Sequence, residues 1–279
     1  MRYRSWHKWL FKGLIFVVAG FVLGILSCRD QNTAAPSQQP AVVISSVAWT
    51  YNGTPNSRIG EKDFRALAEE ARQSFAPMRR LPCRVIIVGE LNVINDRGTL
   101  YLDAQAQTDR TDASIKTGIA AEGLATDAAM AKLLVRKSLK DLFAAVGELV
   151  ALAQSTPAKW IKALQDPEPD MQLLALRLLG KHSIRRGVVP IANLLGDPRE
   201  QVSEAAAAAL GDIGDPAAVP LLIKSIERGN LRSEVRAIEA MGRIGGPEAN
   251  AYLEMTALGH EVPEVRRLSA MLLKRANSL

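Results

Sequence analysis

Cysteine and histidine are scarce in this chain. Its 279 residues include two cysteines, Cys28 and Cys83, and three histidines. Small secreted proteins that depend on a disulfide framework carry many more cysteines, so that class is excluded. A metal centre built from repeated histidine ligands is excluded in the same way. With 48% hydrophobic residues, the chain must obtain its stability from apolar burial.

Acidic residues are absent before Asp30. Residues 1–12 contain four basic residues: Arg2, Arg4, Lys8 and Lys12. An uncharged apolar run, residues 13–26, follows them, and this order is typical of an export signal. As a helix the run would span roughly 21 Å, less than the roughly 30 Å core of a bilayer. Residues 1–27 are therefore predicted to be a signal peptide, with an uncleaved single-span membrane anchor as the alternative.

The apolar run ends in "ILSC", residues 25–28, which resembles the lipobox of bacterial lipoproteins. The resemblance implies cleavage before Cys28, whose sulfur then carries diacylglycerol, and Ser27 is suitably small for the position before the cut. Arg29, where an inner-membrane lipoprotein would have aspartate, implies an outer-membrane location facing the periplasm. Residues 28–40 are polar, small and proline-containing, and are predicted to follow the lipid as a flexible tether.

A strong excess of one charge is also missing from the mature chain. The formal charge of +6 falls to +2 without residues 1–27, which hold four of the 35 Lys+Arg and none of the 29 Asp+Glu. Proteins that bind nucleic acids usually carry a marked basic excess. Together with the export signal, the near balance argues against nucleic acid as a partner.

Residues 157–279 repeat with a period of 31 or 32 residues. Two independent sets of equivalent positions have this spacing: Gly180, Gly211, Gly242 and Lys274, and Leu164, Leu195, Ile226 and Leu258. Such a period is typical of a helical solenoid, here with four repeats of two helices and the fourth repeat as its cap. Asp-Pro pairs begin at positions 166, 197 and 215 and predict helix N-termini. The three glycines predict close helix contacts or helix ends with positive φ.

The stretch "AAAAALGDIGDPAAVPLLIKSI", residues 205–226, resembles HEAT repeats of the short type named after phycobilisome lyases. The resemblance implies an all-α solenoid over 157–279, and it leaves a lyase-like or cofactor-handling role as an alternative. HEAT-type deoxyhypusine hydroxylases hold two irons between several His-Glu pairs. This chain has one such pair, His260-Glu261, so a di-iron site of that kind is excluded.

Residues 41–155 do not repeat and are predicted to form a small α+β domain. Alternating and helical apolar patterns give the order β-α-β-β-β-α, interpreted as an antiparallel sheet with two helices on one face. In the first strand, Val43, Val47, Trp49 and Tyr51 are predicted to share a face, and Thr126 is predicted to cap the last helix. The element order is similar to small periplasmic domains of curli-secretion lipoproteins and of the Tol-system propeller protein.

No catalytic motif, phosphate-binding loop or metal-ligand spacing is present in the sequence. Four carboxylates lie on or near adjacent hairpins: Asp103, Asp109, Asp112 and Glu122. Two of them could act as an acid–base pair, although carboxylates in turns and strands more often face solvent. Cys83 begins a predicted strand and is interpreted as a packed small hydrophobic residue. The chain is therefore predicted not to be an enzyme, with no cofactor and no metal.

Five arginines lie on the second helices of the third and fourth repeats: Arg232, Arg236, Arg243, Arg266 and Arg267. The spacing of Arg232 and Arg236 places both on one helix face. One hypothesis is a basic strip that attracts an acidic protein partner. The alternative is a solvated face balanced by Glu234, Glu239 and Glu264. The sequence thus predicts a membrane-tethered, non-catalytic scaffold of the cell envelope that binds a protein through the concave face of its solenoid.

Overall fold

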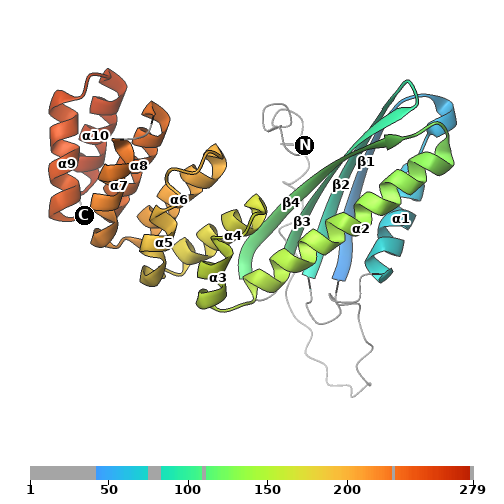
Figure 1. Ribbon diagram of the computed structural model, residues 1–279, viewed down its shortest axis with the longest axis horizontal. Helices are drawn as coiled ribbons and strands as arrows, with labels where there is room; N and C mark the ends of the chain where they lie inside the picture. The colour runs from blue at the N-terminus through green and yellow to red at the C-terminus, as the bar shows by residue number, and fades with distance from the viewer. Residues whose placement is uncertain (1–41, 75–82, 109–110, 228–229, 277–279) are drawn as a thin grey trace, which may run out of the picture. The chain divides into compact units, whose positions relative to one another are not determined.

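The computed structural model describes residues 42–74, 83–108, 111–227 and 230–276, all within one compact unit of the chain (Figure 1). The predicted signal peptide, Cys28 and the tether lie outside the described residues. The structure therefore neither supports nor contradicts the predictions made for residues 1–41.

The first part of the described chain is an α+β domain with the predicted element order. Its elements are β1 (Val42–Asn52), α1 (Glu61–Ser74), β2 (Cys83–Ile94), β3 (Arg97–Thr108), β4 (Thr111–Leu124) and α2 (Ala128–Ala153). The strands lie in the order β1-β2-β3-β4. Their directions correct the predicted antiparallel sheet, because β1 and β2 are parallel and only the two later pairs are antiparallel. The cause is the connection: α1 crosses over between β1 and β2, whereas a two-residue turn joins β2 to β3.

A β-bulge in β1 overturns one predicted face. The pairing with β2 shifts between Ile44 and Ser46, so that one extra residue is inserted. Val43 consequently lies on the outer face of the sheet, 46% exposed, while Val47 lies in the core. Trp49 and Tyr51 stay on the inner side as predicted and are half-buried. Strict alternation fails here because it assumes a strand without insertions.

Both helices of this domain cover the same face of the sheet, as predicted (Figure 1). Helix α1 buries Phe64, Leu67, Ala68 and Ala71 against it. Ile86 and Val88 of β2 point to the opposite face and are exposed. The cap of helix α2 lies one residue later than predicted, because Asp127 and not Thr126 accepts hydrogen bonds from the first free N–H groups.

The second part of the described chain is a stack of helix pairs. The pairs are α3 (Pro157–Ala163) with α4 (Pro169–Lys181), α5 (Val188–Ala192) with α6 (Glu200–Ile213), α7 (Val219–Ile226) with α8 (Leu231–Ile244), and α9 (Gly246–Gly259) with α10 (Pro263–Ala276). The second helices α4, α6, α8 and α10 contact one another in sequence. These pairs correspond to the four predicted repeats.

The repeated glycines are points of close helix contact. A Cβ added at Gly180 would lie 3.2 Å from the Ala209 Cα, and one at Gly211 would lie 3.1 Å from the Ala240 Cα. Both glycines are inside helices, so the alternative explanation of positive φ does not apply to them. Positive φ occurs instead at Gly214, with φ of 68°, where α6 ends. The repeated glycines therefore mark the positions where the backbone of the next repeat packs closely against a helix.

The three predicted Asp-Pro signals all lie just before a helix, and one of them, Asp215, is itself a helix cap. Asp166, Asp197 and Asp215 each accept a hydrogen bond from the backbone N–H two residues later, at 2.9, 2.9 and 3.0 Å. Asp215 caps the 3-10 turn that leads into α7. Asp166 and Asp197 instead form turns two residues before α4 and α6, where they bind the N–H of Glu168 and of Arg199. The short loops between helices are thus held by the same device in successive repeats.

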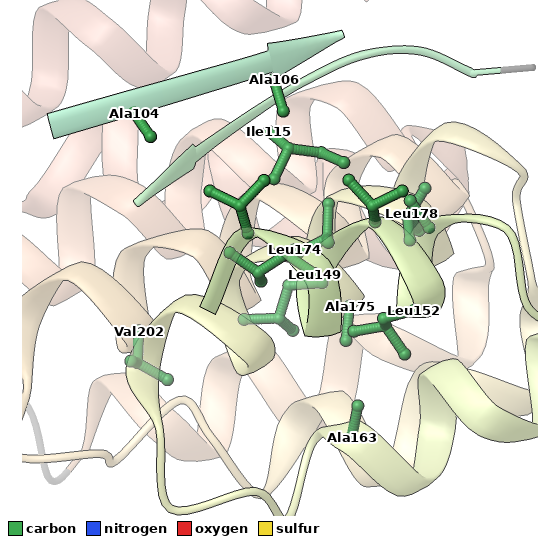
Figure 2. Close-up of a cluster of buried hydrophobic side chains, with 14 of the residues drawn as sticks. Ala104, Ala106, Ile115, Leu149, Leu152, Ala163, Leu174, Ala175, Leu178 and Val202 are labelled. Carbon is green, nitrogen blue, oxygen red and sulfur yellow. The ribbon is translucent and has the colours of Figure 1, made fainter. Parts of the chain in front are cut away.

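The hydrophobic core runs from the sheet into the first repeat (Figure 2). Ala104, Ala106 and Ile115 of the sheet are drawn in one buried cluster with Leu174 and Leu178 of α4. The end of α2 also belongs to it, through Leu149 and Leu152 (Figure 2). In addition, the Trp160 Nε1 donates a hydrogen bond of 2.9 Å to the Leu152 carbonyl. The prediction of separable units 41–155 and 157–279 remains to be tested, and the shared core defines how to test it.

A fragment of residues 157–279 should remain helical but melt at a lower temperature than the full chain. Removing the sheet and α2 uncovers Leu174 and Leu178, and burial of two leucines is worth roughly 3–6 kcal/mol. The measurement is thermal unfolding followed by circular dichroism. A matched fragment, 128–279, retains α2 and should recover part of the loss. Equal melting temperatures for all three chains would show that the shared core adds nothing to the solenoid.

A carboxyl group lies at the same junction. The Thr117 hydroxyl of β4 donates a 2.6 Å hydrogen bond to the Asp170 Oδ2 at the start of α4. Burial raises the pKa of Asp170, the charge of Glu168 adds to the rise, and the bond from Thr117 opposes it. A carboxyl group with a raised pKa favours the folded state most below its unfolded pKa. That contribution is lost as the pH rises through the folded value.

Replacing Asp170 by asparagine should therefore raise the free energy of unfolding more at pH 7 than at pH 4. The amide keeps an acceptor for Thr117 and carries no charge to desolvate. Urea denaturation at both pH values measures the difference. Thr117→Val is the matched control and should destabilise by about 1–3 kcal/mol at pH 7, since it leaves the carboxylate without its donor. A pH-independent effect of Asp170→Asn would contradict this account of the junction.

Candidate functional site

A groove of about 350 Å³ lies between α6 and α8, the second helices of repeats two and three. Its lining residues are Gln201, Glu204, Ala205, Ala208, Arg236, Glu239 and Arg243. Ala205 and Ala208 give it an apolar floor of small side chains, and the charged residues stand around them. Helices α6 and α8 approach closely at Gly211, so long side chains on both helices reach the groove from its two sides.

The arginines of α8 are bound to carboxylates, most of them on the preceding repeat. Arg232 contacts Glu200 at 2.8 Å and Glu204 at 2.7 Å. Arg243, one full period after Asp212, donates a 2.9 Å hydrogen bond to it.

Arg236 completes this arrangement. It donates a hydrogen bond of 3.0 Å to the Glu239 Oε2, and its Nε lies 3.6 Å from the Glu204 Oε1. The bond to Glu239 raises the pKa of the Arg236 guanidinium, and the charge of Glu204 adds to the rise. Three guanidinium groups of α8 thus face four carboxylates, and the groove carries both signs of charge in place of the expected basic strip.

The other two predicted arginines lie elsewhere. Arg266 donates hydrogen bonds to the backbone carbonyls of His260 and Glu261, so it holds the turn before α10. Arg267 is exposed and pairs with Glu264 of its own helix at 2.6 Å. The structure therefore places Arg236 and Arg243 in the lining of the groove, whereas Arg232 and the α10 arginines are not part of that lining. Whether any of the five binds a partner stays a prediction.

Sequence reasoning missed the carboxylates that α6 contributes to these ion pairs. Glu200, Glu204 and Asp212 come from α6, whereas the alternative hypothesis names acids of repeats three and four only. The signal was present in the period, because Asp212 and Arg243 are 31 residues apart. Equivalent positions of adjacent repeats lie on neighbouring helices, so charges of opposite sign one period apart are placed to pair.

A second hollow of about 390 Å³ lies in the α+β domain, lined among others by Trp49, Tyr51 and Arg58. Its aromatic side chains are committed to local structure. The Trp49 Nε1 donates a 2.7 Å hydrogen bond to the Ile59 carbonyl, and its ring stacks on Phe64 with centroids 4.2 Å apart. The Tyr51 hydroxyl lies 2.7 Å from the Thr54 carbonyl, to which it donates. The two aromatic side chains of this hollow are therefore held in place by the surrounding structure.

The residues considered for chemistry are also engaged. His260 accepts a hydrogen bond at Nδ1 from the Val262 N–H, so its Nε2 carries the proton directed to Glu234, at 3.0 Å. Both ring nitrogens are thereby used, and the partner is Glu234 and not the adjacent Glu261. Cys83 is buried, and burial raises the pKa of its thiol to about 11, which suits a packed residue and not a nucleophile.

The candidate carboxylates do not form a pair where they are described. Asp103 lies opposite Gly118 and Glu122 lies opposite Thr99, so the two acids are four residues apart along the sheet, or roughly 13 Å. The side chains of Asp109 and Asp112 lie outside the described part of the chain. Among the described residues, no group of three or more His, Cys, Asp and Glu side chains could hold a metal ion.

Comparison with known proteins identifies the repeat type. Residues 157–237 match the family of HEAT repeats. The match covers the first two helix pairs and α7 and ends within α8, so it includes the α6 wall of the groove and, from α8, Arg236. No curated protein matches the chain. The second part of the chain thus contains HEAT repeats, and the four helix pairs follow one architecture. Within the described residues, no helix has the length and apolar character needed to cross a membrane.

Proposed function

We propose that this protein is a lipid-anchored scaffold of the cell envelope that binds a protein partner in the α6–α8 groove and performs no chemistry of its own. The observation that carries the proposal is the groove itself, an open surface with an alanine floor and charged walls, built by two adjacent HEAT repeats. Solenoid repeats commonly present such surfaces to other proteins.

The walls of the groove favour a protein partner over a small cofactor. Small-molecule sites are usually enclosed and mostly apolar, with a few converging polar groups. Here the charged groups are exposed and already paired, as with Arg243 and Asp212, whose side chains are 42% and 51% exposed. An incoming protein can exchange such pairs for its own, which costs little because exposed pairs contribute about 0–1 kcal/mol. The lyase-like alternative lacks a comparable supporting observation.

The lipid anchor rests on the resemblance of residues 25–28 to a lipobox, and thiol counting tests it. Protein extracted from membranes and denatured in guanidinium should expose one thiol, that of Cys83, because Cys28 is blocked by its lipid. In the native protein Cys83 should also be unreactive, since its thiol is buried with a pKa of about 11. Ellman's reagent measures both states.

Two variants control this experiment. Cys83→Ser should reduce the denatured count to zero, and Cys28→Ala should prevent processing and change the membrane fraction. Two thiols in the denatured wild type would show that Cys28 is free and would favour the uncleaved anchor. Retention of Cys28→Ala at the same size in the same fraction would lead to the same conclusion.

Photo-crosslinking tests the groove. A benzophenone amino acid at Ala205, on the groove floor, should give a discrete crosslinked species in intact cells. The same probe at Val189, an exposed residue of α5, should not. The double variant Arg236→Glu and Arg243→Glu should weaken capture roughly tenfold, because it places repelling charges on one wall.

The matched control for the charge reversal is Arg185→Glu. Arg185 is 78% exposed and lies 3.9 Å from Asp215, away from the groove. Both charge variants should melt close to the wild type, since exposed pairs add little to stability. Equal crosslinking from Ala205 and Val189, or equal loss with Arg185→Glu, would place the binding surface elsewhere.

A further inference from the structure

Helix α9 has apolar side chains on two sides, and only one of them is covered. Ala249, Leu253 and Thr256 face the core and are buried. On the opposite side, Met255 is 61% exposed and Leu258 is 81% exposed. An apolar stripe on a helix normally packs against another element. The described residues supply a partner for one side only.

The repeat pattern shows what the uncovered side is built to receive. Leu258 has the repeat position of Leu164, Leu195 and Ile226. Leu164 is 3% exposed, and Leu195 and Ile226 pack partly buried against the core. The repeat position of Met255 shows the same pattern. Its equivalents Ile161, Ala192 and Ile223 in the first three repeats are also packed against the core. These positions are covered in each repeat that another repeat follows, and in the fourth they are open.

We call the uncovered surface formed by Met255 and Leu258 the end face. The charged residues around it are divided by sign between α9 and α10. The charged residues of α9 are all acidic, Glu248 and Glu254, whereas α10 carries Arg266, Arg267, Lys274 and Arg275 against the single acid Glu264. Exposed Met271 adds an apolar side chain on α10. An acidic apolar helix therefore lies beside a basic one.

We infer that the end face binds the end face of a second copy of this chain. A twofold axis running parallel to α9 and α10, between them, would lay α9 of each copy on α10 of its partner. Leu258 and Met255 would then be covered near Met271, and acidic residues of α9 would face basic residues of α10. The contact extends the repeat-to-repeat interface already present inside the chain. The inference goes beyond the proposed function and does not depend on the groove.

The end face also bears on the prediction that the fourth repeat is the cap of the solenoid. A capping repeat presents polar side chains on its outer side to remain soluble. Met255 and Leu258 stand on that side instead. An apolar surface rimmed by charges is typical of an association site.

Sedimentation velocity of the full chain in a density-matched mild detergent tests the inference. The wild type should sediment as a concentration-dependent dimer. Leu258→Glu should weaken the dimer by about 10- to 100-fold, as expected for losing a buried leucine. Because Leu258 is exposed in the single chain, the Leu258→Glu variant should keep the melting temperature of the wild-type monomer. Val189→Glu, at another exposed apolar position (63% exposed, on α5), is the control and should remain dimeric.

Charge exchange separates this dimer from other associations. Arg267→Glu with Lys274→Glu should weaken it, and adding Glu248→Lys with Glu254→Lys should restore it. A monomeric wild type, a dimer that survives Leu258→Glu, or equal loss with Val189→Glu would overturn the inference. Co-purification of a different protein that Leu258→Glu releases, without a dimer, would also overturn it and assign the end face to that protein.

Discussion

The close approach of one second helix to the next is the constraint on which the repeat part of this protein depends. At Gly180 and Gly211 the neighbouring Cα lies 3.2 and 3.1 Å from where a Cβ would stand, so a larger side chain would push the repeats apart. Each helix is thereby seated against the previous one at a defined point. The alanine-rich surface of α6 follows from the same requirement, because Ala206 and Ala209 are buried at this contact.

This close packing of adjacent helices also determines which charged side chains meet at the groove. Since equivalent residues lie on adjacent helices, an acid in one repeat meets a base in the next, as Asp212 meets Arg243. Individually such exposed pairs contribute little to stability. Collectively they leave a surface of alternating charge over a floor of small side chains. A surface of this kind selects a partner by its charge pattern more than by its net charge.

The α+β domain is joined to the solenoid by packing as well as by chain connection. The end of α2 covers α4 where a preceding repeat would otherwise lie, and the inner faces of β3 and β4 extend that cover (Figure 2). The first repeat therefore has a capped outer side, formed by Leu149, Leu152 and their neighbours. The fourth repeat has the opposite condition, with Met255 and Leu258 uncovered among the described residues.

Much of this architecture could be predicted from the sequence, and the failures have physical causes. The period of 31 or 32 residues, the Asp-Pro pairs before helices and the stripe of Phe64, Leu67, Ala68 and Ala71 are local patterns, and local patterns determine local structure. The order of elements in the α+β domain could be predicted for the same reason. The directions of the strands and the bulge at Ser45 could not be predicted, because both depend on which strand pairs with which.

The candidate site shows the same division. Sequence position alone indicated that Arg232, Arg236 and Arg243 lie on the second helix of one repeat. Only the tertiary structure showed that carboxylates of α6 pair with them and that Arg266 binds backbone carbonyls instead. Helix periodicity tells which residues share a face, but the charge of a surface depends on the neighbouring helix as well. That neighbour, and the side of α9 left without one, are decided by how the repeats pack.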